Sequence, residues 1–232
     1  MPLTIFKTID NYGAMLNKLA TINFFVLVLL LYFLSEQSQE LKQTIENYSW
    51  EVPVLSFNIP FGYFLPCLVL AIFGRIIKLH DKISDIFRIR RWYDWTFILK
   101  PMMEATSAEV SKKIVIKNRG SIMFKVFYKY ASSRDPHSIV DRHLIEMVMD
   151  QLSWYWILLE TILYVFASVI VLFYLESFDQ MLTLIYIGLA LVVFAKIVQL
   201  SCAKYTKQEV SIIIEAASRK REIKEEFDAL RT

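Results

Sequence analysis

The fold is decided by two apolar runs joined by a short acidic loop, in LSWYWILLETILYVFASVIVLFYLESFDQMLTLIYIGLALVVFAKIVQL (residues 152–200). As helices rising 1.5 Å per residue, runs 152–175 and 181–200 are each long enough to cross a hydrocarbon core about 30 Å thick. Trp154 and Trp156 mark one end, as aromatic belts do at membrane interfaces. The stretch therefore predicts a hairpin of two membrane-spanning helices.

A third apolar run covers residues 19–35, which carry no charged side chain. A cleaved signal peptide is the competing interpretation. The run exceeds the usual signal-peptide core of about 7–15 residues, and no small-residue cleavage pattern follows it. We therefore expect a retained first span.

A fourth uncharged segment covers residues 52–74, but Pro60 and Pro66 fall inside it. Each proline removes an amide donor and crowds the preceding turn. A helix that begins instead at Asn58 has only about 15 residues before Arg75, which is short for a span. We expect a kink at the prolines, with residues 52–57 at the outer interface, in preference to a re-entrant element.

The composition supports a membrane protein. Of 232 residues, 56% are hydrophobic and 21% are charged, and the mean hydropathy is +0.41, whereas ordinary globular chains carry about 25% charged residues. Two cysteines and five glycines exclude a disulfide scaffold and a collagen-like chain, and make glycine-rich phosphate loops implausible.

Basic residues predict the orientation. Lysine and arginine number fifteen in residues 75–151 and eight from 196 onward, against one in residues 36–51 and none in 176–180. The positive-inside rule then places both termini and residues 75–151 in the cytosol, with the protein in the plasma membrane, which is the inner membrane of a bacterium.

We therefore predict an all-α, polytopic protein with four transmembrane helices, of which helices two to four extend into a small helical cytosolic domain. The segments are a cytosolic stub with the first span (1–35), a short outer loop (36–51), the second span (52–74), the cytosolic helical domain (75–151), the third span (152–175), the fourth span (181–200) and a cytosolic C-terminal helix (201–232).

Apolar spacing predicts helices inside the cytosolic domain. The second helix continues past Arg75 as far as Ile86 or Phe87, and Lys100-Pro101 marks a break. Residues 138–151 contain no breaker and run as a helix straight into the third span. Residues 114–130 fit either a hairpin or a turn followed by a helix, and we favour a helix over 121–131. The tail extends the fourth span and packs on the cytosolic domain or on a sister subunit.

Two ionisable residues lie inside predicted spans. Glu160 and Lys196 are each eighteen residues from Phe178 in the hairpin loop, so an antiparallel pair of helices brings them to the same depth. A charged residue in a membrane is expensive and marks a functional site by default. We expect the pair to lock the hairpin, and the alternative is a path for ions or protons.

Weak candidates for catalysis or metal binding flank the membrane: His80 after the second span, and His143, Glu146 and Asp150 before the third. The last three share one helical face, which suits a general base or a metal cluster. Charged residues among basic neighbours are also what any solvated juxtamembrane helix shows. We expect no catalytic residue, no metal and no cofactor.

A basic and aromatic segment begins at Arg88 and suits anionic lipid headgroups, a nucleotide or single-stranded nucleic acid. Lipid is the default, because the charge of +6 on residues 75–151 is what the topology rule alone produces; nucleic acid is not expected. The candidate residues are Arg88, Arg90, Arg91, Trp92 and Trp95.

The sequence thus favours a non-enzymatic membrane effector or scaffold that forms homo-oligomers and couples a cytosolic protein partner or signal to the lipid bilayer. The alternatives are a small ion or proton channel or transporter using Glu160 and Lys196, and a membrane-anchored hydrolase or nuclease. A role in bacterial stress or antiviral defence is expected only from how often small membrane proteins serve there, and no residue points to it.

Overall fold

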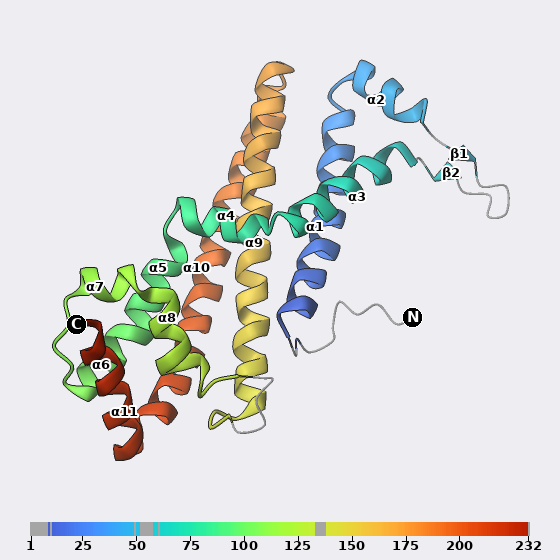
Figure 1. Cartoon of the computed structure of the whole chain (residues 1–232). Coiled ribbons are helices and arrows are strands. Elements are labelled where there is room, and N and C mark those ends of the chain that lie inside the picture. Colours follow the sequence, from blue (N-terminus) through green and yellow to red (C-terminus); the bar gives the residue numbers. More distant parts are fainter. Residues whose placement is uncertain are drawn as a thin grey trace. The chain divides into compact units, whose positions relative to one another are not determined.

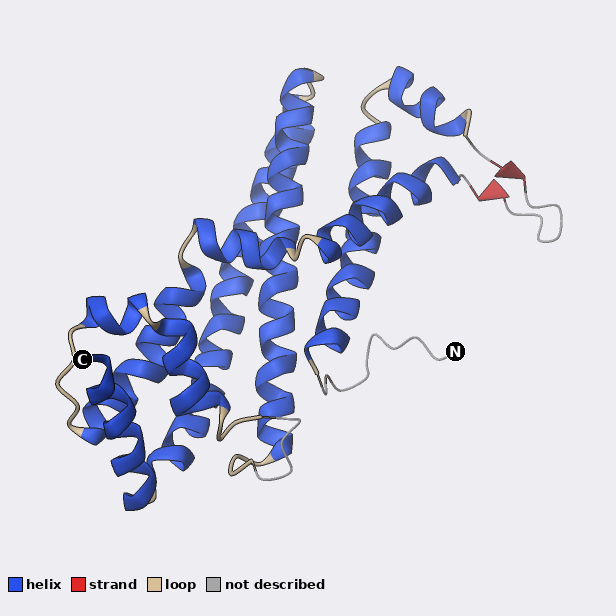
Figure 2. Cartoon of the chain, viewed as in Figure 1, coloured by secondary structure: helices blue, strands red, loops and turns tan. Residues whose placement is uncertain are grey.

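The computed structural model describes residues 9, 11–48, 50–51, 58–59, 61–132 and 138–231 (Figure 1). Helices make up most of them (Figure 2), which confirms the all-α prediction. The α-helices are α1 (Tyr12–Ser35), α2 (Gln39–Glu46), α3 (Phe61–Ile76), α4 (Leu79–Ile86), α5 (Ile89–Asp94), α6 (Lys100–Thr106), α7 (Lys112–Lys117), α8 (Arg119–Met123), α9 (Arg142–Tyr174), α10 (Phe178–Ile214) and α11 (Ala217–Asp228).

Shorter elements complete the described chain. Two π-helical segments, η2 (Trp95–Leu99) and η3 (Phe124–Tyr128), follow α5 and α8, and a 3-10 turn, η4 (Ala229–Arg231), ends it. Strands β1 (Trp50–Glu51) and β2 (Asn58–Ile59) pair antiparallel, with Trp50 opposite Ile59.

Three helices, α1, α9 and α10, are long and apolar enough to cross a membrane. The fourth apolar segment reaches that standard only when α3 and α4 are taken together, and these two are bent by 60° at the break between them. The described chain thus has three candidate spans, or four if the bent pair is one span.

The prediction that the second helix continues unbroken past Arg75 is wrong. The backbone of Lys78 is left-handed, with φ 52°, and its N–H donates to the Arg75 carbonyl at 3.3 Å in place of the α-helical acceptor. A second left-handed residue, Arg88, separates α4 from α5. The 60° bend lies at this break, whereas Pro66 lies inside α3 and Pro60 lies outside the described residues.

The break predicted at Lys100-Pro101 is also wrong, because the chain stays helical from Ile89 to Thr106. The π-helical turn η2 comes just before the proline, and the Lys100 N–H donates to the Trp95 carbonyl. This wider turn accommodates a ring that would crowd the preceding turn of a regular helix. Helices α7, α8 and η3 confirm the helical alternative for residues 114–130.

The described chain divides into two compact units. The first comprises Leu16–His80 and Ser153–Ile197, and the second comprises residues 81–152 and 198–231 with a short segment near the N-terminus. Helices α9 and α10 each contribute residues to both units without a break.

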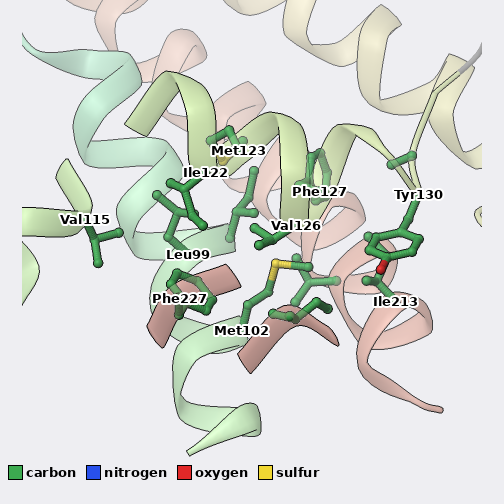
Figure 3. Close-up of a cluster of buried hydrophobic side chains, with 14 of the residues drawn as sticks. Leu99, Met102, Val115, Ile122, Met123, Val126, Phe127, Tyr130, Ile213 and Phe227 are labelled. Atoms are coloured by element: carbon green, nitrogen blue, oxygen red, sulfur yellow. The ribbon is translucent and has the colours of Figure 1, made fainter. Parts of the chain in front are cut away.

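The core of the second unit is apolar and fully buried (Figure 3). Leu99 and Met102 lie among Ile122, Val126 and side chains of the C-terminal tail. The tail turns after Ile214, and α11 packs against α6 and η3 with Ile223 and Phe227 buried. Of the two packings predicted for the tail, the structure thus has the one on its own domain.

In the first unit, α1 and α9 pack side by side and point in the same direction. The Lys18 ammonium lies 4.3 Å from the centre of a Trp154 ring, Asn23 bonds to Glu160, and Leu34 shares an apolar cluster with Leu172. Contacts therefore advance together along both helices. Helix α10 returns beside α9, as the predicted hairpin requires: Leu184 joins the same cluster.

Candidate functional site: a buried polar cluster among the apolar helices

Glu160 lies in the apolar part of α9 and is 3% exposed. Its Oε2 accepts a hydrogen bond from the Asn23 side-chain amide of α1, and its Oε1 lies 3.7 Å from Nδ1 of His80 in α4. His80 and Asn23 are 1% and 3% exposed. The cluster therefore joins three segments that are far apart in the sequence.

The local backbone explains why His80 reaches α9. It is the second residue of α4 and follows the left-handed Lys78, where the chain turns by 60°. Its ring packs against Trp156, one helical turn before Glu160, with ring centres 5.7 Å apart. Trp156 and Glu160 are spaced to share one face of α9.

Further polar contacts hold the segments around this cluster. Tyr63, at the start of α3, has its hydroxyl 2.7 Å from that of Ser35 at the end of α1. At the other end of α3, the Arg75 Nε donates to the Asn17 side chain at 3.0 Å. The α3 helix is thereby fastened to α1 near both of its ends.

The chemistry of the cluster follows from its surroundings. A carboxylate removed from water is costly unless hydrogen bonds or opposite charge compensate it. The Asn23 amide supplies a donor, and His80 would supply a positive charge if its ring were protonated. Asn23 Oδ1 is buried and has no hydrogen-bond partner among the described residues, so a protonated Glu160 would find an acceptor beside it. The cluster is therefore suited to holding a proton or to locking three segments together.

The predicted partner of Glu160 was Lys196. The structure gives Glu160 the neighbours Asn23 and His80, whereas the Lys196 side chain is exposed on α10. Their pairing stays a prediction. Sequence reasoning did not single out Asn23, although a carboxamide inside an apolar run is itself a signal, because such side chains bond between helices in membranes.

The other candidates for chemistry do not gather into a site. His143 is exposed in the first turn of α9, Glu146 bonds to Arg142 at 2.9 Å, and Asp150 is half-buried. His80, by contrast, belongs to the polar cluster. Among the residues that the structure describes, no three His, Cys, Asp or Glu side chains are grouped so that they could hold a metal.

The basic and aromatic candidates separate into two groups. Arg90 pairs with Asp81, and the half-buried Trp95 has the Lys112 ammonium 5.2 Å from its ring centre. Arg88, Arg91 and Trp92 are exposed.

Comparison with known proteins gives the family. The sequence profile of the YmfE protein family matches residues 11–228. The chain belongs to this family. The residues that the family profile matches include Asn23, His80 and Glu160. A relative from Escherichia coli (strain K12), the uncharacterized protein YmfE, is 24% identical over an alignment of 188 positions, and the match covers 75% of each chain. No solved structure matches the chain.

Proposed function

We propose that this member of the YmfE protein family is a non-enzymatic membrane scaffold that couples a folded cytosolic unit to events in the bilayer. The observation that carries the proposal is the continuity of α9 and α10. Each runs unbroken from an apolar stretch into the core of the second unit, where Ile145 of α9 and Ile213 of α10 are buried. Because a packed helix moves as a stiff element, a shift of its apolar part is transmitted to that core.

This function includes four membrane crossings, which are part of the proposal. Helices α1 and α9 point in the same direction, so if both cross the membrane, the chain must return between them. The intervening apolar segment is the bent pair α3–α4. It contacts α1 at Ser35 through Tyr63, and reaches the level of Glu160 at His80. The positive-inside rule then favours cytosolic termini.

The polar cluster is the element through which the scaffold would respond. Glu160 holds α1 and the α3–α4 break against α9, and α9 continues into the second unit. A change in the protonation or packing of this cluster would alter the position of α9. The coupling would therefore run from the bilayer to the second unit along one helix.

Hydrogen exchange on the full chain in nanodiscs tests the coupling. Glu160→Gln should raise amide exchange in residues 142–152 of α9 and in the packed residues around Ile213, although the substitution lies in the first unit. Phe166→Leu, at an exposed position on the same helix, is the control and should leave both regions unchanged. If Glu160→Gln affects the first unit alone, the coupling is wrong.

A second candidate function, ion or proton transport, is favoured by one observation: an acid and an imidazole lie buried together among apolar helices. In liposomes, it requires that Glu160→Gln abolish flux while the protein remains folded, and that Lys196→Met reduce it. Unchanged flux in Glu160→Gln, or no flux in the parent protein, would remove this candidate.

Self-association and a cytosolic protein partner are also proposed. The face of the tail that could have formed a coiled coil is buried in its own unit, so subunits would meet through the apolar helices. Light scattering in detergent, with the detergent mass subtracted, should give a discrete oligomer. A monomeric mass would contradict self-association and leave a scaffold that docks a protein partner.

The proposed role in stress or antiviral defence is tested by challenging a deletion strain with phage.

A further inference from the structure

The corner between α4 and α5 exposes apolar and basic side chains together. Ile86 and Phe87 are 74% and 71% exposed, and they are followed by the exposed Arg88 and, one turn later, by the exposed Arg91 and Trp92. We call these five residues the α4–α5 corner. Large apolar side chains favour a hydrocarbon environment, whereas arginines favour water or polar headgroups. The membrane interface offers both environments side by side.

The corner is held in shape by its own backbone. Arg88 is left-handed, with φ 54°, and the Arg90 N–H donates to the Ser84 hydroxyl at 3.1 Å. Arg90 also pairs with Asp81. The exposed Lys82 and Asp85 on α4 offset each other, so the net exposed charge of the corner comes from Arg88 and Arg91.

Chain length places the corner near the membrane surface, provided that α9 crosses the membrane as proposed above. His80 lies between the levels of Trp156 and Glu160 on α9. Ile86 follows His80 by six residues within one helix, which is about 9 Å at 1.5 Å per residue. The headgroup layer adds about 5–8 Å on each side of the hydrocarbon core. The corner therefore cannot extend far beyond this layer.

We propose that the α4–α5 corner is a binding site for anionic phospholipids. Ile86 and Phe87 enter the acyl region, Trp92 lies at headgroup level, and Arg88 and Arg91 bind the phosphate groups. The planar guanidinium forms paired hydrogen bonds to phosphate oxygens, and the positive charge complements an anionic leaflet. This assigns a lipid class to residues that neither the polar cluster nor the core of the second unit uses.

A spin label at position 87 tests the location. The native cysteines, Cys67 and Cys202, are both buried, and alanine replaces them in the full chain used for labelling. After reconstitution, a nitroxide at Phe87→Cys should collide with oxygen more than with a water-soluble nickel reagent. Lys113→Cys, at an exposed position of α7, is the control and should show the reverse. Equal nickel accessibility at both positions overturns the proposal.

Lipid selectivity tests the chemistry. The protein in phosphatidylcholine vesicles should retain spin-labelled phosphatidylglycerol in preference to spin-labelled phosphatidylcholine. Arg88→Asn with Arg91→Gln should lower that preference at least about fivefold, the effect of one basic residue at an anionic surface. Asparagine suits the left-handed position of Arg88, so the variant keeps the turn. Arg221→Gln with Lys224→Gln, at exposed positions of α11, removes the same charge and should change nothing.

The outcomes separate this site from the proposed function. If both pairs of substitutions reduce the preference equally, it reflects total charge and no lipid site exists at the corner. A label at position 87 that reports water while α3–α4 still crosses the membrane refutes the lipid site alone, and the corner is then a surface for a protein. If α3–α4 does not cross the membrane, both the lipid site and the proposed function are refuted.

Discussion

At the scale of single residues, Asn23 stabilises the apolar unit through one hydrogen bond. Its side-chain amide donates to Glu160, 137 residues further along the chain, and both groups are buried. Hydrogen bonds to charged groups contribute more than neutral ones, and a buried acceptor left without its donor is costly. The contact therefore fixes how α1 meets α9.

Removing this donor should destabilise the protein measurably. Asn23→Ala is expected to lower the free energy of unfolding in mixed micelles by about 1.5–3 kcal/mol. Thr21→Ala is the control, since the Thr21 hydroxyl donates a local, exposed hydrogen bond to the Asn17 carbonyl at 2.9 Å within the same helix; its effect should stay within about 0.5 kcal/mol. Equal losses in the two variants would show that Asn23 does not hold the helices together.

Two glycines provide a matched test of packing. A Cβ added at Gly62 in α3 would lie 2.1 Å from the carbonyl oxygen of Ile45 in α2, and backbone cannot move aside cheaply. Gly62→Ala should therefore lower the unfolding free energy by about 1–3 kcal/mol. At Gly120 in α8 nothing lies within 4 Å, and Gly120→Ala should raise it by about 0.5–1 kcal/mol. Thermal unfolding measures both, and a shift of the same sign in both would contradict this packing.

At the scale of elements, α11 is fastened to the second unit by its polar side as well as by its buried side chains. Glu222 accepts a hydrogen bond from Tyr130 at 2.6 Å and pairs with Lys129, and Lys125 pairs with Glu226 at 2.6 Å. The Arg219 guanidinium donates to the Ile212 and Ile213 carbonyls at the end of α10. The two Arg219 hydrogen bonds satisfy carbonyl groups that the end of a helix leaves without partners inside the helix.

Acid should loosen α11. Hydrogen bonds from Lys129 and Tyr130 hold the pKa of Glu222 below its ordinary value. A carboxyl with a lowered folded-state pKa stabilises the fold above its unfolded pKa, near 4.3, and loses this contribution as the pH falls through the folded pKa. The unfolding midpoint of the parent should therefore drop more between pH 6 and pH 3 than that of Glu222→Gln. Parallel pH profiles would contradict the role of Glu222.

Run length and composition were enough to predict the helices that depend on hydrophobicity. The hairpin of α9 and α10, the first apolar helix and the extension of α9 before residue 152 all follow from long uninterrupted apolar spacing. The breaks at Lys78 and Arg88 could not be predicted, because ordinary side chains there adopt the left-handed conformation that glycine or asparagine would have signalled. The break predicted at Pro101 is absent, because a π turn accommodates the proline without ending the helix.

The candidate site was predictable only in part. Glu160 stands out as a charge in an apolar run, but its neighbours come from α1 and α4, which no local pattern connects to it. The sequence places His80 after the second span and Glu146 before the third, and therefore predicts that both flank the membrane. The bend at Lys78 is what gives His80 its contact with α9, and that bend left no signal in the sequence.

At the scale of the whole molecule, the proposed topology requires the bent pair α3–α4 to return the chain across the membrane. If α1 and α9 both cross the membrane, their parallel packing requires that return. Helices α9 and α10 then connect the membrane-spanning part to the second unit without a break. If the return fails, α1 and α9 cannot both cross in the direction that their contacts require. The proposed coupling and the lipid site at the α4–α5 corner then lose their common basis.

Cysteine accessibility in intact cells tests this claim most directly. In a chain whose own cysteines are replaced by alanine, Tyr48→Cys before α3 and Lys113→Cys in α7 are each treated with a membrane-impermeant maleimide. We expect labelling on opposite sides of the membrane. Position 48 should react in intact cells and position 113 only after permeabilisation, and Ser177→Cys between α9 and α10 should behave like position 48. Labelling of positions 48 and 113 from the same side would contradict the proposed topology.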